Sequence, residues 1–510
     1  MKGNEIIAES EVIKEYRRKQ LQGLGKPIDS WLDGSVRCVR VNDKVYRSPN
    51  WKTFEDFLFA FIQEKLTADW ARAEMQKPID SRHPIMQWYD RLAKFQTEQA
   101  QQKTASPVYF SEPTGAIQGF LNLAYYLYLC EHHGVLTDKM LQRLRDSGNF
   151  EGALYELYVT ASFLKAGFLL ELEDENDSTG SHHEFAATHS TSGRKFSVEA
   201  RTRYSSSKRA GRSVDLPRVK DKLCEALKKS AMHERIVFIE LNRAEYATDG
   251  MPPAWVKQIE KDFGDAEREF LTQVPENPSA YVFVTNQSFM HWIDEAPKPP
   301  LQFATGHNIV DFPASRRPST MEMVVESREK HAEMYDLLES LGRTSVPSSF
   351  DHRTPEEYFG VIDRPMVGMI FLLPDQEGNM IAGKLLDAQI IEQEKSLFGQ
   401  FKTDKGVLLA TFPLTDFEMA AYFRSPETFL GVFKQNPRNI SDPYHCYEFA
   451  YQSYSQSTSE FLIENLQQWY PLDELQELSH GELVKRYCLS VAAMMWSSAH
   501  PEKIVSNQGQ

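Results

Sequence analysis

Two acidic residues in the middle of the chain have the types and the spacing to hold a metal ion. In KFSVEARTR (195–203), apolar and polar residues alternate as they do in a half-buried β-strand. Alternation sends Phe196 and Val198 to one face of the strand and Glu199 and Arg201 to the other. Glu199 and Arg201 therefore project side by side with opposite charges.

The second acidic residue, Glu184, lies in the segment HHEFAAT (182–188). A Ser- and Gly-rich turn connects this segment to KFSVEARTR (195–203). A hairpin built from the two segments can bring Glu184 close to Glu199. Two carboxylates a few ångströms apart repel each other unless one is protonated or a cation lies between them. Mg²⁺ and Mn²⁺ prefer carboxylate and phosphate oxygens, so this pair predicts a site for one of these ions.

A third carboxylate, Glu156, belongs to the helix that the apolar spacing predicts from Asn149 to Gly167. Its neighbours at helical spacing include Ala153 and Val159, so it lies on a face without a partner charge. Burying a carboxylate there is costly, and we expect Glu156 to join the metal site. The alternative is a Glu at the helix edge that bonds to a nearby basic side chain.

A basic window follows these acids, although the whole chain carries a formal net charge of −15. Between Arg194 and Arg235 there are thirteen Lys or Arg residues and five Asp or Glu residues, a local net charge of +8. Such a window can bind a phosphate backbone, and the alternative is a solvated basic face. The residues expected to contact nucleic acid are Arg203, Lys208, Arg209, Arg212, Arg218 and Lys222.

The order of the predicted elements indicates an α/β fold around these residues. Helix, strand and hairpin are followed by a basic helix (216–229), a strand (236–241), a helix (253–272) and a strand (281–285). The continuous apolar character of RIVFIEL and AYVFVTN is typical of central strands covered on both faces. Mixed strands and helices of this kind form a layered α/β domain.

The rest of the chain predicts several domains, since 510 residues suffice for about three of ordinary size. We expect a mainly helical N-terminal region, a helical connector, the α/β domain, a linker and an α+β C-terminal domain. Their predicted bounds are 1–105, 106–148, 149–315, 316–350 and 351–510.

Several classes of protein are excluded by composition and pattern. The chain is 41% hydrophobic and 25% charged, so it can bury a core, but it has no apolar run long enough to span a membrane. Its N-terminus alternates charges where a signal peptide is apolar, which predicts a cytoplasmic protein without a membrane partner. The five cysteines lack metal-site spacing. There is no Walker A or G-x-G-x-x-G motif, so nucleotide hydrolysis by this chain is not expected.

The pattern YELYVTASFLKAGF (155–168), HHEFAAT (182–188) and KFSVEARTR (195–203), followed by a basic helix, resembles the PD-(D/E)xK nuclease superfamily. The resemblance covers roughly residues 149–290 and implies a restriction-endonuclease-like mixed sheet flanked by helices. It also implies that Glu156, Glu184 and Glu199 bind Mg²⁺ or Mn²⁺, with Glu184, Glu199 and Arg201 in the catalytic roles.

Two residues depart from the family's pattern. His183 and Glu184 replace the Pro-Asp pair and retain a carboxylate, whereas Arg201 replaces the lysine. A guanidinium is always charged and holds phosphate as a planar fork, so Arg201 can stabilise charge but cannot act as a base. Arg203, or a lysine of the basic helix such as Lys220 or Lys222, could take the lysine's place.

These features lead to two hypotheses. The first is a metal-dependent nuclease that hydrolyses phosphodiester bonds, with DNA as the expected substrate and phage defence or repair as the setting that the fold suggests. The second is a degenerate nuclease domain that binds nucleic acid or a partner protein without cutting. A homo-oligomer or an NTP-hydrolysing partner protein is compatible with either hypothesis.

Overall fold

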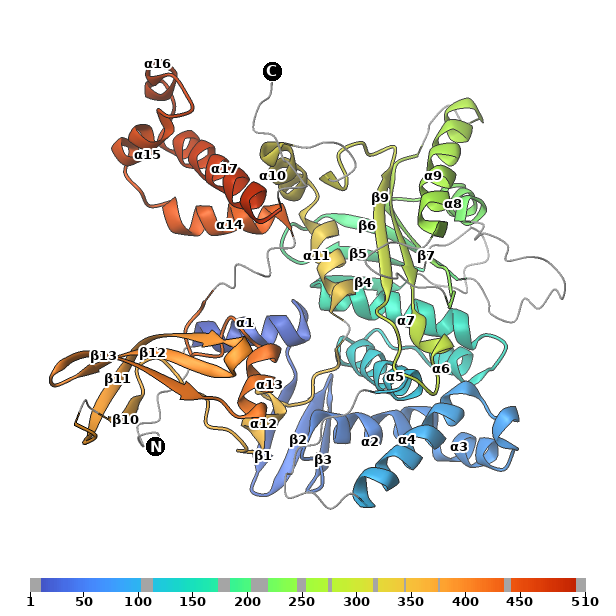
Figure 1. Ribbon diagram of the computed structural model, residues 1–510. Coiled ribbons are helices and arrows are strands. Elements are labelled where there is room, and N and C mark those ends of the chain that lie inside the picture. The colour runs from blue at the N-terminus through green and yellow to red at the C-terminus, as the bar shows by residue number, and fades with distance from the viewer. Residues whose placement is uncertain are drawn as a thin grey trace. The chain divides into compact units, whose positions relative to one another are not determined.

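The computed structural model has a mixed α/β architecture, the class that the sequence predicts (Figure 1). The chain forms two compact units, each assembled from three segments. The first unit comprises Met1–Ala266, Phe283–Phe303 and Glu339–Gln435; the second comprises Glu267–Val282, Ala304–Leu338 and Asn436–Gln510. The structure describes residues 11–101, 113–172, 184–202, 219–244, 254–273, 278–314, 320–343, 345–374, 377–434 and 442–500.

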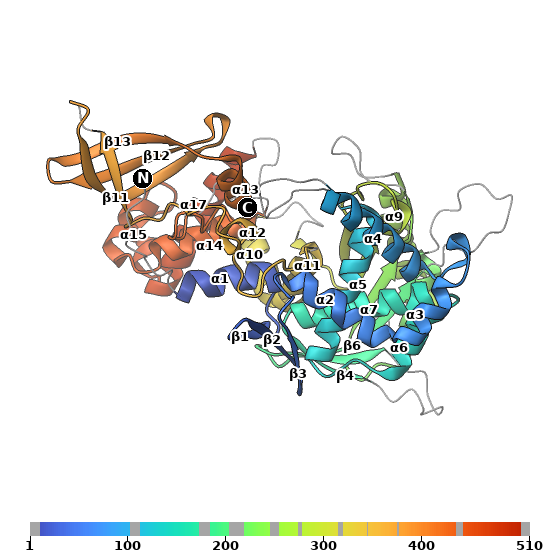
Figure 2. The same cartoon turned by 90° about the horizontal axis from the view of Figure 1, so that it is seen from below.

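The N-terminal region is mainly helical, with one small antiparallel sheet of three strands. Helix α5 is the central helix of this region and is apolar on most of its surface, because it packs against α2, α4 and α7 (Figure 2). The helices are α1 (Glu11–Gln22), α2 (Phe54–Leu66), α3 (Ala68–Met75), α4 (Pro84–Gln101), α5 (Gly115–His132) and α6 (Asp138–Arg145). The strands are β1 (Asp29–Asp33), β2 (Val36–Val41) and β3 (Lys44–Ser48).

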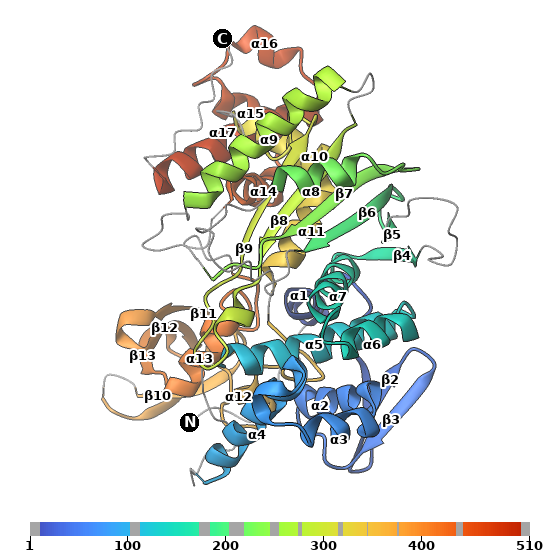
Figure 3. The same ribbon diagram turned by 90° about the vertical axis from the view of Figure 1, so that its right-hand side faces the viewer.

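A six-stranded sheet, with its strands side by side in chain order from β4 to β9, forms the predicted α/β domain. Strands β4, β5 and β6 are antiparallel neighbours, whereas β6 and β7 are parallel and are joined by a crossover that contains α8. Helix α7 packs against one face of the sheet, and α8 lies over the other (Figure 3). The strands are β4 (Phe168–Leu172), β5 (Phe185–His189), β6 (Lys195–Thr202), β7 (Glu234–Glu240), β8 (Ala280–Asn286) and β9 (Leu301–His307). The helices are α7 (Phe150–Lys165), α8 (Val219–Leu227) and α9 (Ala254–Gln273).

Helix α7 is attached to the sheet by an aromatic cluster. The ring of Phe163 lies 5.0 Å from that of Phe168, 5.3 Å from that of Phe185 and 5.8 Å from that of Phe238, measured between centroids. The helix stops at Gly167, whose φ of +83° favours glycine, and the chain turns directly into β4. The strand predicted in KFSVEARTR (195–203) is β6, and β9 is a strand that the sequence analysis did not predict.

A second, four-stranded antiparallel meander lies in the predicted C-terminal region. Alternate residues such as Leu385, Leu397 and Phe401 point into its core. Its strands are β10 (Ile370–Pro374), β11 (Met380–Ile391), β12 (Ser396–Thr403) and β13 (Gly406–Pro413), with the helices α12 (Pro355–Tyr358) and α13 (Asp416–Arg424) beside them in the sequence.

Most of the remaining helices share a hydrophobic core within the second unit. Residues 316–350, predicted as a linker, contain the helices α10 (Met321–Lys330) and α11 (Ala332–Gly342), and Met321 and Val325 are fully buried in this core. The last helix begins after Ser479, whose side chain forms a capping box with Glu482. The other helices are α14 (Pro443–Tyr454), α15 (Ser459–Leu466), α16 (Leu472–Gln476) and α17 (His480–Ala499).

Within the residues that the structure describes, the search for a helix with the length and hydropathy to cross a lipid bilayer found none.

Candidate functional site

Glu184 lies directly before β5, and Glu199 lies on the neighbouring strand β6. The register pairs Phe185 with Val198, and the backbone N–H of Glu184 also donates to the carbonyl oxygen of Val198, at 2.9 Å. The hairpin therefore holds the backbone of Glu184 next to that of Val198, the residue before Glu199.

Two cations contact the carboxylate of Glu199, whose side chain is only 1% exposed. Arg201, two residues along the same strand, has its Nη2 atom 2.7 Å from Oε1. Lys229, just after α8, donates from Nζ to Oε2 at 2.8 Å. Since a buried carboxylate needs compensating charge, these two cations account for the burial of Glu199.

The structure brings a lysine to the site from a different position than the sequence indicates. Lys222 donates to the backbone oxygen of Thr202 at 2.8 Å, so it ties α8 to the end of β6. Lys229, seven residues further on, reaches Glu199 instead. Because β6 and β7 are parallel, the chain must run back from the end of β6 to the start of β7. On this way back, the residues after α8 pass Glu199.

Glu156 takes up the alternative role weighed for it, because it bonds to a basic side chain. Arg143, from the last turn of α6, donates through Nη1 and Nη2 to the two carboxylate oxygens at 2.5 Å each. This bidentate pair joins α6 to α7. Residue spacing could not predict this ion pair, because Arg143 lies in α6 and Glu156 lies in the next helix, α7.

Burial and neighbouring charges change the titration of Glu184. The pKa of Glu184 is raised from its ordinary value to about 8, mainly by burial and then by the negative charges of Glu156 and Glu199. Lys229 and Arg143 act in the opposite direction. A cation next to Glu184 would therefore favour its ionised form.

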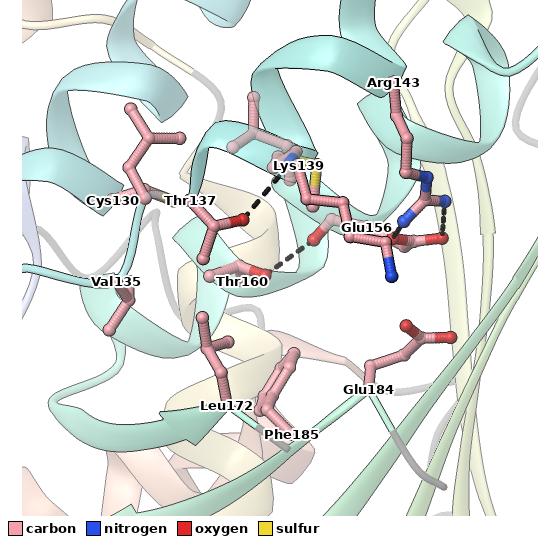
Figure 4. Close-up of a pocket in the computed structure, with 13 residues that line it drawn as sticks. Cys130, Val135, Thr137, Lys139, Arg143, Glu156, Thr160, Leu172, Glu184 and Phe185 are labelled. Carbon is pink, nitrogen blue, oxygen red and sulfur yellow. Dashed lines mark hydrogen bonds and ion pairs between the residues drawn. The ribbon is translucent and has the colours of Figure 1, made fainter. Parts of the chain in front are cut away.

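A pocket of about 280 Å³ opens beside Glu156 and Glu184. Figure 4 shows Lys139, Arg143, Glu156 and Glu184 gathered at one end of it. Much of the remaining lining is apolar and includes Val135, Leu157, Leu172 and Phe185. The candidate site thus combines a charged end, where the acids lie, with apolar surface.

The donor set suits a hard divalent cation, although the acids do not form a three-carboxylate cage. Within the part of the chain that the structure describes, no group of three or more His, Cys, Asp or Glu residues lies close enough together to hold a metal ion. Mg²⁺ commonly binds one or two carboxylates and keeps several waters. Glu184 and Glu199, whose charges interact, are the two carboxylates that could hold such an ion.

Most of the residues predicted to contact nucleic acid, namely Arg203, Lys208, Arg209, Arg212 and Arg218, lie outside the described residues. His183, which precedes Glu184, also lies outside them. Their placement therefore stays a prediction from the sequence.

Comparison of this chain with protein-family models, with curated proteins and with solved structures found no match. The functional argument consequently depends on the residues of this site and on the order of the elements that carry them.

Proposed function

We propose that the chain is a metal-dependent nuclease that hydrolyses phosphodiester bonds of nucleic acid, with DNA as its substrate. The observation that carries the proposal is the position of Glu184 at the start of the β5–β6 hairpin, where the negative charges of Glu156 and Glu199 both raise its pKa. A negative site of this kind, next to basic side chains, fits a Mg²⁺ or Mn²⁺ ion and a phosphate group.

The side chains of the site divide the work of hydrolysis among them. Glu184 and Glu199 would hold the ion, and Glu156 would bind it directly or through a water. When bound, the ion would polarise a phosphoryl oxygen and lower the pKa of a water ligand. Arg201 would stabilise the charge that develops on the phosphate. Lys229 would position the attacking water, a role suited to an ammonium group that can exchange protons.

The order of elements supports the same proposal. A helix with Glu156, a three-stranded antiparallel part with Glu184 and Glu199, a crossover helix and a parallel strand follow one another as in the PD-(D/E)xK pattern that the sequence resembles. Lys229 supplies an ammonium group beside Glu199, which the sequence lacks at position 201. A role in phage defence or repair remains an expectation from this resemblance alone.

One observation favours the second hypothesis, a domain that binds nucleic acid without cutting it. Arg143 contacts both oxygens of Glu156, and Arg201 and Lys229 each contact an oxygen of Glu199. Cations in these places neutralise charge that a metal ion would otherwise neutralise. Under this hypothesis, the ion pairs would stabilise the fold, and the domain would bind nucleic acid without cleaving it.

The test is incubation with plasmid, linear duplex and single-stranded DNA, and with RNA, in Mg²⁺ or Mn²⁺. We expect cleavage by the wild type and a loss of at least about 100-fold in Glu199→Gln, since removing one charge-stabilising group commonly costs that much. Lys229→Met should lose about 10- to 100-fold through kcat, and Lys229→Arg should recover only part of it.

Lys228→Met is the matched control, because Lys228 is the exposed neighbour of Lys229 and carries the same charge. It should cleave like the wild type. Mn²⁺ binding, measured by calorimetry, should weaken in Glu184→Gln and in Glu199→Gln. A wild type that binds DNA in a salt-sensitive way, but neither binds Mn²⁺ nor cuts any substrate, would establish the binding role instead.

A further inference from the structure

We propose that the pocket beside Glu156 and Glu184 receives one unpaired nucleobase of the substrate strand. This inference rests on the proposed function and adds to it a substrate class, a strand whose base is free to leave the stack. It follows from the shape of the pocket, the chemistry of its lining and its position next to the acids.

The lining of the pocket matches the two parts of a nucleotide. Val135, Leu172 and Phe185 supply apolar surface to the pocket, which suits the face of a base (Figure 4). Lys139 and Arg143 lie at the charged end, where the phosphate attached to that base would be. Proteins that bind single strands combine basic side chains with aromatic rings on which bases stack, and Phe185 is an aromatic ring of this lining.

Two hydroxyl groups in the lining can read the edge of a base. Thr160 donates from Oγ1 to the backbone oxygen of Glu156 at 2.8 Å, which leaves its oxygen able to accept. Thr137 accepts from the backbone N–H of Met140 at 3.2 Å, which leaves its hydroxyl hydrogen able to donate. The pocket thus offers one acceptor and one donor to a base.

The size of the pocket selects an unpaired base over a base pair. Its volume of about 280 Å³ lies just below the roughly 300–1,000 Å³ usual for ligand pockets, so we expect it to hold a single base and not a base pair. A base in a duplex has its edge paired and its faces stacked, and it would have to leave the helix to enter. Single strands, loops and unpaired ends avoid that cost.

The position of the pocket links base binding to the reaction. Glu156 and Glu184 line the pocket themselves, so the backbone of a nucleotide held there runs past the site proposed for the metal ion. Base binding would then position a phosphodiester bond next to Glu184. The pocket would therefore help to decide which bonds are presented to the acids.

The test measures binding in Ca²⁺, so it does not depend on cleavage. Fluorescence anisotropy compares a twelve-nucleotide single strand of DNA with a strand of the same length made of abasic sites. We expect the base-bearing strand to bind about tenfold more tightly to the wild type, as loss of one base contact commonly costs this much. Val135→Trp, which fills the pocket, should bring the two Kd values within about twofold.

Two further variants keep the test decisive. Thr160→Val removes one hydroxyl at similar volume and should reduce the preference for bases by a smaller factor. Val407→Trp adds the same bulk to an exposed side chain of β13 and should leave the tenfold preference unchanged. Thermal denaturation checks that each variant folds. Equal binding of both strands by the wild type, or an unchanged preference in a folded Val135→Trp, would overturn the inference.

Competition by deoxyadenosine monophosphate separates a base within a strand from a free nucleotide. One outcome would be that the monophosphate binds with a low Kd and displaces the strand, while the abasic strand binds as tightly as the normal strand. In that case the pocket binds a free nucleotide, and the proposal that it binds a base of the strand is wrong. Normal cleavage without a preference for the base-bearing strand would contradict only the proposal that the pocket binds a base. A preference for the base-bearing strand without cleavage would contradict only the proposal that the chain is a nuclease.

Discussion

Two buried glutamates on adjacent strands of the central sheet show how neighbours decide the chemistry of a carboxyl group. Glu199, on β6, is surrounded by the cations Arg201 and Lys229. Glu240, at the end of β7, accepts hydrogen bonds from Thr285 Oγ1 at 2.6 Å and from backbone N–H groups instead. Because burial outweighs these neutral donors, the pKa of Glu240 is raised to about 7.

This raised pKa predicts that part of the protein's stability is lost as the pH rises. The folded state keeps the proton on Glu240 up to about pH 7, whereas the unfolded chain releases it near pH 4.3, so stability falls between these values. Glu240→Gln should remove this fall and exceed the wild type at pH 8 by up to about 3 kcal/mol. Thermal denaturation at pH 5 and pH 8 measures it.

Glu225→Gln, at an exposed position of α8, is the control and should keep the pH dependence of the wild type. If Glu240→Gln and the wild type lose the same number of degrees in Tm between pH 5 and pH 8, Glu240 does not contribute the expected proton.

At the scale of elements, the site depends on how α7 is attached to the sheet. Phe163 lies on this helix two turns after Glu156, and its side chain is fully buried against β4, β5 and β7. The same aromatic cluster includes Phe185, the residue after Glu184. Packing around Phe163 therefore holds the helix that carries one acid against the strand next to a second acid.

Phe163→Ala should destabilise the fold by about 3–5 kcal/mol, because truncating a buried aromatic ring removes its burial and leaves a cavity. Phe163→Leu should cost less, since it keeps more of the volume. Thermal denaturation measures both, and Phe423→Ala, at a side chain 61% exposed, is the control with little expected change. A stability of Phe163→Ala equal to that of the control would show that α7 is held by other contacts.

At the scale of the whole molecule, charge is distributed unevenly along the chain. If the chain binds nucleic acid as proposed, its formal net charge of −15 would repel the partner at long range, whereas the window from Arg194 to Arg235 would attract it. Binding should therefore depend on a few local contacts with phosphates, each of which releases counterions when it forms.

Replacing three residues of the window, Lys208→Gln, Arg209→Gln and Arg212→Gln, should lower the slope of log Kd against log salt by about 2 for single-stranded DNA. The measurement is fluorescence anisotropy between 50 and 200 mM salt, a range roughly suited to such contacts. Three exposed lysines of the C-terminal meander, replaced as Lys384→Gln, Lys395→Gln and Lys402→Gln, provide the charge-matched control. Equal slopes for the two triple variants would contradict a binding role for the window.

The sequence by itself determined the local elements of the central domain. Alternation predicted β6 and helical spacing predicted α7, because side-chain direction repeats every two residues in a strand and every 3.6 in a helix. The predicted hairpin of β5 and β6 is present, and the charge of Glu199 acts on Glu184 at its start.

Only the tertiary structure decided which cations meet these acids. Arg143 reaches Glu156 from another helix, and Lys229 reaches Glu199 across the crossover. The pocket likewise combines side chains from α6, α7, β4 and β5. No periodicity records such contacts, since they depend on how separate elements pack and on the direction in which the chain returns to the sheet.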